Sequence, residues 1–396
     1  MPVPGVKGAF MLEDLITYER EVDQPTRALT ADVFGTFASG GVRSVYARTS
    51  LKDEALPSAK IVGMRTRLIE AFTFPDYLTA RMLMADGMVH MHTVLRSIGS
   101  CIGINASSRA WNAVAARREG GPGSVLLSVD YKRMDKSVPY ACYMACLSFV
   151  FGFYSWLWRA NPERAILERT LACYLMSCAR PQRSVDGALV YGYAGNLSGD
   201  YLTTVINTVL NSMYWFLCFE SEFGLSFEQY HERVCPWMSI YGDDTSICVQ
   251  QEFAAMTPER VAYRMAEVGQ TVTLAGGQKG ALTVDAGGGK TFLRRGFRRV
   301  GDRVYCPLEV ASLVKSLFYY RPSSSGSDVD MVRHLSVLRT LWEEAFFHDD
   351  EVRDRIRELV VMCRDQLPPH YRTRPFVSDE ELAARWEAGS FKVWEL

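Results

Sequence analysis

The chain has 396 residues, of which 48% are hydrophobic and 22% charged, and its formal net charge at pH 7 is −1. This composition excludes an intrinsically disordered chain and allows a large buried core, which length alone would divide between two or three domains. Because the net charge is close to zero, a nucleic-acid partner would have to bind local basic clusters rather than a global basic field. The sequence has three such clusters: Lys60/Arg65/Arg67, Arg117/Arg118 and Arg294/Arg295/Arg298/Arg299.

The ten cysteines lack the spacings of a zinc site, and their positions in apolar runs predict buried free thiols in a reducing compartment. No signal peptide is expected, because residues 1–5 contain neither a basic region nor an apolar core. The uncharged run 137–158 is long enough to cross a bilayer. Pro139, Gly152 and several hydroxyl side chains interrupt it, so we favour a buried core helix and predict no integral membrane segment.

Residues 52–70 are the first segment that suggests chemistry. Alternation from Arg65 to Ile69 predicts a strand with Arg65 and Arg67 on one face, and Lys60 comes shortly before it. Two guanidinium groups on one strand face can clamp a polyphosphate through bidentate hydrogen bonds. A solvated edge strand explains the alternation equally well.

The apolar spacing in residues 76–118 predicts helix, and a glycine-rich loop follows it. The continuous apolar run 125–129 then predicts a buried strand that ends at Asp130. A carboxylate in that position needs a charged partner or hydrogen bonds. We therefore expect Asp130 to form one wall of a metal site.

Residues 195–208 predict a glycine-containing loop that enters a helix. Thr203 and Asn207 are four residues apart, so they share one face of an otherwise apolar helix and can contact the same small ligand. Ordinary capping of the helix N-terminus is the alternative, and it is slightly favoured when this segment is considered alone.

The segment from Ile240 to Thr245 reads YGDD between two apolar arms and predicts a tight β-hairpin, with Gly242 at positive φ. The neighbouring carboxylates of Asp243 and Asp244 repel each other unless a cation relieves the repulsion. Mg²⁺ suits this position because it binds one or two carboxylates together with substrate phosphates. A solvated turn would explain an isolated GDD motif better. With Asp130 as the second wall, two ions could hold the attacking and leaving oxygens of a phosphoryl transfer.

From residue 308 onward, apolar side chains recur at helical spacing, and the serine-rich segment 322–327 separates two parts of this region. The acidic residues between Glu343 and Glu351 are expected to form a solvated face.

The motifs occur in the order TRLIE (from Thr66), DxxxxD (from Asp130), SGxxxTxxxN (from Ser198) and YGDD (from Tyr241). This order resembles the palm of viral RNA-dependent RNA polymerases, most closely those of the picornavirus-like group. Residues 52–70 are similar to the family's fingers motif that contacts the incoming nucleotide, and residues 291–295 to its primer-grip strand. The region before Lys52 is shorter than in picornavirus enzymes.

The resemblance, which covers roughly residues 50–320, implies an α+β fold shaped as a right hand, with an antiparallel-sheet palm, fingers and a helical thumb. The implied subdomains are fingers (1–124), palm (125–158), a fingers insertion (159–194), palm (195–307) and thumb (308–396).

The resemblance also implies roles for individual residues. Asp130 and Asp243, assisted by Asp244, would hold two Mg²⁺ or Mn²⁺ ions, and Lys279 would be the general acid that protonates the leaving pyrophosphate. Asp135 and Asn207, with Ser198 and Thr203, would recognise the ribose, whose 2′-hydroxyl distinguishes RNA from DNA precursors. The implied nucleotide-binding residues are Lys60, Arg65, Arg67, Asp135, Ser198, Gly199, Thr203 and Asn207.

The implied reaction is RNA-templated attack of a primer 3′-hydroxyl on the α-phosphate of an NTP, in the replication of a positive-strand RNA virus genome. Implied partners are template and primer RNA, NTPs and viral replication proteins, in membrane-associated complexes of the host cytoplasm. Two alternatives are a reverse transcriptase and a polymerase-like RNA-binding scaffold. The pair Asp135 and Asn207 favours ribonucleotides over the first, and the presence of every expected metal and ribose residue argues against the second.

Overall fold

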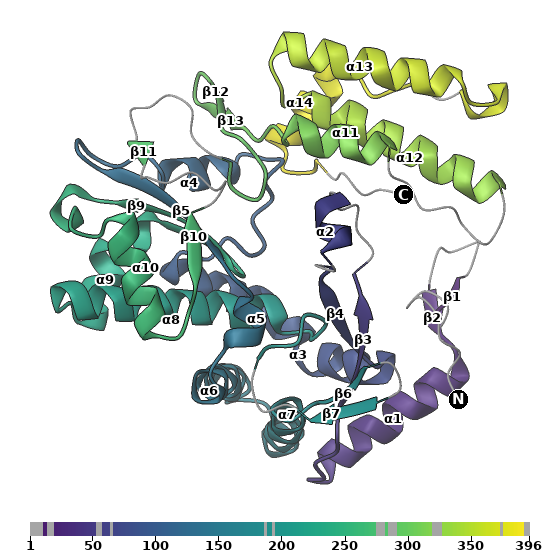
Figure 1. The fold of residues 1–396 in the computed structure, drawn as a ribbon. Coiled ribbons are helices and arrows are strands. Elements are labelled where there is room, and N and C mark those ends of the chain that lie inside the picture. The colour runs from purple at the N-terminus through teal and green to yellow at the C-terminus, as the bar shows by residue number, and fades with distance from the viewer. Residues whose placement is uncertain are drawn as a thin grey trace.

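Two larger β-sheets and a set of C-terminal helices form the framework of the molecule (Figure 1). The computed structural model describes residues 11–13, 20–52, 58–63, 66–185, 188–191, 195–274, 282–283, 291–318, 327–372 and 375–391. Near the N-terminus a two-stranded ribbon precedes a helix that begins after the capping side chain of Asp23. These elements are β1 (Met11–Glu13), β2 (Arg20–Val22) and α1 (Gln24–Ala38).

The first sheet contains the expected carboxylates and is antiparallel throughout. Its strand order is β10-β5-β9-β8, and β11 also pairs with β5. Its strands are β5 (Val125–Tyr131), β8 (Met238–Tyr241), β9 (Asp244–Val249), β10 (Val272–Leu274) and β11 (Leu282–Thr283). Period-2 alternation buries Val129 and Tyr131 in β5 and leaves Asp130 between them exposed. The strand therefore runs one residue past Asp130, where the sequence predicted its end.

Helices on one side of this sheet bury its apolar face. The long helix α8 begins after a loop, as predicted, and ends at Gly224, which adopts the left-handed conformation that glycine tolerates best. It packs on β8, α9 and α10, and its inner face contributes large side chains such as Trp215 to the main core. The helices are α8 (Thr203–Phe223), α9 (Phe227–Arg233) and α10 (Pro258–Glu267), with 3₁₀ turns η3 (Cys235–Trp237) and η4 (Gln251–Phe253).

Helix α6 is the apolar run that the sequence raised as a membrane candidate. Among the described helices it alone is long and apolar enough to cross a membrane, and a third of it is buried in the protein. Its inner face packs into the core against α3 (Phe74–Leu95), α7 and α8, as expected for a core helix. Phe149 and Trp156 on its outer face stay exposed, so its burial is less complete than predicted. The neighbouring elements are α5 (Met134–Ser137), α6 (Tyr140–Leu157) and α7 (Arg164–Cys178).

A second sheet has the order β4-β3-β6-β7, in which β3 and β6 run parallel. Its elements are β3 (Tyr46–Leu51), α2 (Ser58–Val62), β4 (Leu68–Phe72), β6 (Gln182–Val185) and β7 (Ala188–Tyr191). The predicted start of the strand at Arg65 is wrong, because β4 begins at Leu68. Arg67 precedes the strand, although its carbonyl oxygen still accepts a hydrogen bond from the backbone N–H of Lys52 at 2.7 Å. Lys60 lies in α2, and Arg65 lies outside the described residues.

The helix predicted over residues 76–118 is interrupted. It consists of α3 (Phe74–Leu95), η2 (Arg96–Ile98) and α4 (Trp111–Ala116). Gly99 leaves the helical conformation with a φ of +87° and lies against Met238. The N–H of Cys101 then donates to the carbonyl oxygen of Ile240 at 2.7 Å, and the N–H of Ile240 donates to that of Gly99 at 2.9 Å. Backbone pairing with the edge of β8 therefore replaces helix in this segment.

The C-terminal part is helical, as predicted, and lies above both sheets in Figure 1. Its elements are β12 (Arg298–Val300), β13 (Arg303–Tyr305), α11 (Val310–Phe318), α12 (Ser327–Ala345), α13 (Asp350–Asp365), η6 (Pro369–Tyr371) and α14 (Asp379–Glu387). Helices α11, α12 and α13 share a separate apolar core that includes Leu313, Leu338 and Val360.

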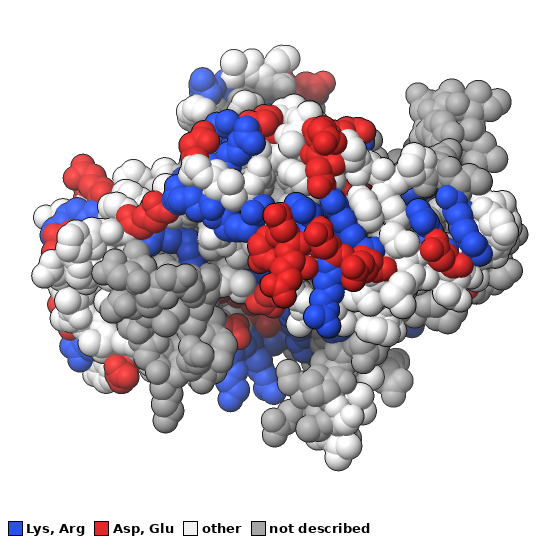
Figure 2. Space-filling view, turned by 90° about the horizontal axis from the view of Figure 1, so that it is seen from above, with Lys and Arg blue, Asp and Glu red and all other residues white. Residues whose placement is uncertain are grey.

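Two expectations about this part are wrong. Residues 291–295 form a tight turn and not a strand, because Leu293 and Arg294 both have positive φ and Phe292 pairs with Arg295. Glu344 is not solvated, since it is buried and accepts two hydrogen bonds from the Arg295 guanidinium, at 2.7 and 2.9 Å. Viewed from above, acidic and basic side chains lie next to one another across this side of the molecule (Figure 2). All ten cysteines are free thiols, as predicted, but only seven are buried, whereas Cys142, Cys173 and Cys363 are partly exposed.

Candidate active site

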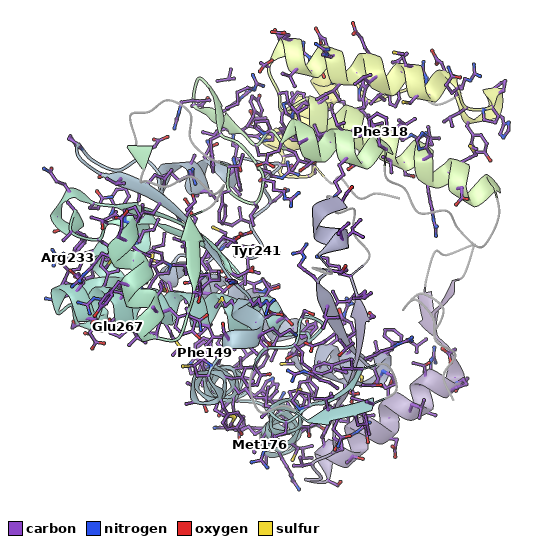
Figure 3. The ribbon with its side chains drawn as sticks, viewed as in Figure 1. Phe149, Met176, Arg233, Tyr241, Glu267 and Phe318 are labelled. Carbon is purple, nitrogen blue, oxygen red and sulfur yellow. The ribbon has the colours of Figure 1, made fainter. Side chains whose placement is uncertain are left out.

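The YGDD segment forms the tight hairpin that the sequence predicts. Strands β8 and β9 pair up to Tyr241 and Asp244, so Gly242 and Asp243 are the two turn residues. Gly242 has a φ of +63°, whereas Asp243 has no positive φ, a pattern that fits a type II′ turn with glycine first. Asp243 and Asp244 both open to solvent. In Figure 3, Tyr241 lies at the edge of the sheet nearest to α2 and β4.

Strand pairing brings Asp130 to the same end of the sheet. The antiparallel register of β5 and β9 places Val129 opposite Thr245, so the next positions, Asp130 and Asp244, stand opposite each other. Residues opposite each other in an antiparallel pair project to the same face, with Cβ atoms about 5 Å apart. The structure thus gathers Asp130, Asp243 and Asp244 from two strands and one turn.

The charges of these acids interact. The surrounding protein desolvates the carboxyl of Asp244 and raises its pKa to about 6, and the charges of Asp243 and Asp130 add to the rise. Desolvation also raises the pKa of Asp243, with the charge of Asp130 acting in the same direction. A bound cation would relieve both the repulsion and the desolvation. Within the described ranges, no three His, Cys, Asp or Glu side chains form a ready-made metal cage. Mg²⁺ does not need such a cage, because it takes one or two carboxylates and completes its shell with water and phosphate oxygens.

Two arginines from other parts of the chain act on this acidic site. The positive charge of Arg67 lowers the pKa of Asp243, against the larger effect of desolvation. The charge of Arg294, in the turn after the sheet, opposes the rise in the pKa of Asp244 in the same way. Arg67 is therefore near enough to the turn for its charge to act on Asp243.

A two-residue connection after β5 leads into α5, which contains Asp135. Arg133 adopts the left-handed conformation with a φ of +61°, which is uncommon for a residue other than glycine, and α5 follows directly. The carbonyl oxygen of Asp135 accepts a hydrogen bond from the N–H of Asn196 at 2.7 Å. Gly195 lies against the same carbonyl, where a Cβ would come within 2.7 Å of the oxygen. Asp135 therefore lies beside the loop that leads into α8.

Asn207 and Thr203 lie on one face of α8, as the spacing predicted, but they differ in what they contact. The side-chain oxygen of Asn207 accepts a hydrogen bond from Nδ2 of Asn196 at 2.9 Å. The hydroxyl of Thr203 donates to the carbonyl oxygens of Leu197 at 2.5 Å and Asp200 at 2.8 Å. Thr203 thus holds the loop before the helix, while the Asn207 side chain contacts that loop through Asn196.

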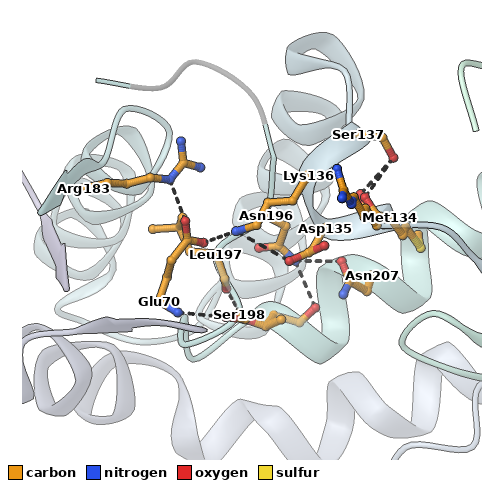
Figure 4. A network of polar contacts seen from close by, with 12 residues as sticks. Glu70, Met134, Asp135, Lys136, Ser137, Arg183, Asn196, Leu197, Ser198 and Asn207 are labelled. Carbon is orange, nitrogen blue, oxygen red and sulfur yellow. Dashed lines mark hydrogen bonds and ion pairs between the residues drawn. The ribbon is translucent and has the colours of Figure 1, made fainter. Parts of the chain in front are cut away.

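Glu70 on β4 joins α5 and β6 through an ionic network that the sequence did not reveal (Figure 4). Its carboxylate accepts a hydrogen bond from Nζ of Lys136 at 2.5 Å and forms an ion pair with Nε of Arg183 at 2.9 Å. The backbone N–H of Glu70 donates to the hydroxyl of Ser198 at 3.0 Å. A Cβ at Gly199 would collide with the carbonyl oxygen of Glu70, so glycine is required there. The loop with Ser198 and Gly199 is thereby docked on β4.

Sequence reasoning missed Glu70, Lys136, Arg183 and Asn196, whose partners are distant in the chain. It also missed Thr208 and Asn211, although Asn211 extends the four-residue spacing of Thr203 and Asn207 and could have been found from it. Lys279 lies outside the described residues, as does Arg65, and Lys60 is placed only by its position in α2.

Comparison with known proteins gives consistent matches. A sequence model of one family, described as viral RNA-dependent RNA polymerase, matches residues 19–364. The RNA1 polyprotein of Arabis mosaic virus (isolate NW) is 28% identical over 352 residues, covering 87% of this chain and 14% of the polyprotein. The genome polyprotein of Cosavirus A (isolate Human/Pakistan/0553/-) is 25% identical over 302 residues, covering 74% and 13%.

Among solved structures, the Sicinivirus 3Dpol RNA dependent RNA polymerase superimposes with a TM-score of 0.70 at 16% identity. This alignment covers 96% of this chain and 74% of that chain. The chain therefore shares the fold over nearly its whole length, while it spans only a small part of the polyproteins that it matches.

Proposed function

The chain belongs to the viral RNA-dependent RNA polymerase family, and from this premise we propose that it extends an RNA strand along an RNA template with nucleotides from NTPs. The resemblance to the picornavirus-like group and the right-hand α+β fold are confirmed. The family match does not favour a reverse transcriptase. The observation that carries the proposal is the convergence of Asp130, Asp243 and Asp244 at one end of the palm sheet.

The three carboxylates fit a site for divalent cations, because the charge of Asp130 contributes to the raised pKa of both Asp243 and Asp244, and all three side chains open to solvent. Asp130 and Asp243 would be the main ligands of two Mg²⁺ or Mn²⁺ ions, with Asp244 assisting. When bound, such ions neutralise developing charge and hold the attacking and leaving oxygens of a phosphoryl transfer. The protein contributes the register of β5 against β9 and the turn that holds Asp243.

Ribose recognition would fall to Asp135 and Asn207, which border the loop between residues 195 and 202. This assignment is supported by Asn196, which links the two residues. Its backbone N–H donates to the carbonyl oxygen of Asp135, and its side-chain Nδ2 donates to Oδ1 of Asn207. A carboxylate and an amide can together accept from and donate to a 2′-hydroxyl. Ser198, Gly199 and Thr203 hold this loop in place.

The triphosphate would be bound on the fingers side. The proposed role of Arg67 in binding the triphosphate is supported by its electrostatic effect on Asp243. Lys60 and Arg65 extend the same basic segment. Lys279 is proposed as the general acid that protonates the leaving pyrophosphate; its support is the motif order alone. The proposed subdomain limits are fingers to residue 124, palm 125–158 and 195–307, a fingers insertion 159–194 and thumb from 308.

Template and primer RNA and NTPs are the proposed partners, together with other viral replication proteins. The matched relatives are parts of viral polyproteins, which supports replication inside a host cell. We place this activity in the host cytoplasm, in membrane-associated complexes.

The test is extension of a primed RNA template with labelled NTPs and Mg²⁺ or Mn²⁺. Wild type should extend the primer strongly with rNTPs and weakly with dNTPs. Asp243→Asn and Asp130→Asn should each abolish extension, whereas Asp32→Asn, which alters an exposed acid on α1, should not. Extension that survives in folded Asp243→Asn protein would refute the assigned site. A wild type that binds RNA but never extends it would indicate a scaffold instead.

A further inference from the structure

The inner face of α8 carries a buried amide in apolar surroundings. Asn211 is fully buried, and neighbouring positions of the helix, such as Leu210 and Tyr214, contribute to the apolar core. Burial of an amide costs free energy unless every polar atom finds a partner. The partners of Asn211 therefore indicate why an amide occupies this position.

All four hydrogen-bonding positions of the Asn211 side chain are used. Its Oδ1 accepts from the hydroxyl of Tyr131 and from the hydroxyl of Thr245, each at 2.9 Å. Its Nδ2 donates to the carbonyl oxygens of Gly242 at 3.0 Å and Asp243 at 3.3 Å. An amide can form two bonds of each kind, so its capacity is saturated.

Thr208 adds a fifth contact from the same helix. Its hydroxyl oxygen accepts a hydrogen bond from the backbone N–H of Gly242 at 2.9 Å, and the residue is fully buried. Helix α8 therefore contacts both the N–H and the C=O of Gly242, the first residue of the turn.

These contacts join the two walls of the metal site. Tyr131 follows Asp130 directly on β5, and Thr245 follows Asp244 directly on β9. The turn that Asn211 contacts contains Asp243 itself. One side chain thus fixes the end of β5, the start of β9 and the turn between β8 and β9 relative to one another.

We propose that Asn211, together with Thr208, is a positioning residue that sets the separation of Asp130 and Asp243 and so determines the affinity of the site for divalent cations. The inference rests on the proposed function, because it concerns the same carboxylates. Residues that orient metal ligands without touching the metal change affinity by about 10- to 100-fold when they are removed.

The chemistry predicts a distinct effect for each substitution. Asn211→Leu keeps the approximate volume and leaves two hydroxyls and two carbonyl oxygens without their partner. Asn211→Asp keeps the acceptor for both hydroxyls and places a carboxylate oxygen against the two carbonyl oxygens of the turn. Thr208→Val is nearly isosteric and removes only the acceptor for the Gly242 N–H, whereas Thr208→Ser retains it.

A matched control is Thr170→Val in α7. Thr170 is fully buried like Thr208, and its hydroxyl donates to the carbonyl oxygen of Ile166 at 2.6 Å, far from the carboxylates. Both valine substitutions therefore remove one hydroxyl hydrogen bond at a buried position of a helix.

The experiment measures Mn²⁺ binding to the full chain by electron paramagnetic resonance, without RNA or NTP. Mg²⁺-dependent primer extension and the KM for NTP are measured in parallel. Thr208→Val and the Asn211 variants should bind Mn²⁺ about tenfold more weakly or worse. Extension should need correspondingly more Mg²⁺, and Thr208→Ser and Thr170→Val should behave as wild type.

Wild-type Mn²⁺ affinity in folded Thr208→Val and Asn211→Leu would overturn the inference. If Asn211→Leu does not fold, the contrast between Thr208→Val and Thr208→Ser decides the question. A wild type that binds Mn²⁺ but does not extend RNA would refute the proposed function, and the Mn²⁺ affinities of the variants would still test the positioning role.

Discussion

Glu70→Gln removes the negative charge on which two cations from different parts of the chain converge. Glu70 comes from β4, Lys136 from α5, and Arg183 from β6. The Glu70 side chain is 5% exposed, and those of Arg183 and Lys136 are 15% and 35% exposed. Glutamine has nearly the same shape, so the substitution changes charge and hydrogen bonding with little change in packing.

The size of this effect on stability depends on which interactions Lys136 and Arg183 retain after the substitution. Removal of one partner from a buried ion pair costs about 3–5 kcal/mol, because an uncompensated charge stays behind. Lys136 is partly solvated and has Asp135 as a second partner at 3.6 Å, whereas Arg183 is largely buried. We therefore expect a loss near the lower end, about 3 kcal/mol in the free energy of unfolding.

The same substitution should also weaken NTP binding. Lys136, freed from Glu70, would turn further toward Asp135, the proposed ribose contact, and the loop docked on β4 through Ser198 would be less firmly held. Chemical denaturation gives the change in stability, and steady-state primer extension gives the KM for NTP.

Glu222→Gln is the matched control, because its carboxylate also receives two arginines, Arg260 at 2.5 Å and Arg264 at 2.8 Å. That cluster joins α8 and α10 away from the carboxylate site. It should lower stability and leave the KM unchanged. Glu70→Gln protein with wild-type stability and wild-type KM would refute the reasoning.

Three further outcomes are expected. The buried carboxyl of Asp200 has a pKa raised by burial to about 6, from 3.8 in the unfolded chain. The folded protein binds this proton more tightly than the unfolded chain does, so the free energy of unfolding of wild type should fall by about 3 kcal/mol as pH rises from 4 to above 6. Asp200→Asn should lack this loss in denaturation at each pH, and parallel pH curves would contradict the assignment. Gly199→Ala should displace the loop from β4, because the added Cβ would collide with the carbonyl oxygen of Glu70. We expect a lower melting temperature and a higher KM for NTP. An unchanged KM would contradict this prediction. Because the pKa of Asp244 is about 6, Mn²⁺ must compete with protons for this carboxylate below that pH. Mn²⁺ binding should therefore weaken from pH 8 to pH 5, with proton release on binding. Calorimetry in two buffers measures the proton release, and pH-independent binding would contradict the prediction.

Local patterns in the sequence determined the parts of this protein that depend on neighbouring residues. The turn at Gly242 and Asp243 follows from glycine between two apolar arms, and β5 follows from a short apolar run. The start of α8 after a glycine-containing loop was likewise predictable, because helix periodicity begins there. The order of these segments was enough to indicate the family.

Only the tertiary structure decided which distant residues complete the site. Tyr131 and Asn211 are 80 residues apart, and Lys136 and Glu70 are 66 apart, yet each pair is joined by a hydrogen bond. Likewise, Gly99–Cys101 pairs with the edge of β8 instead of continuing a helix, and Leu293 and Arg294 form a turn instead of a strand. Such contacts have no periodic signature, because they depend on how elements pack and which backbone groups are left to pair. The sequence therefore determined the carboxylates and the turn that carries them, and the packing of α8 and β4 decided how they are held.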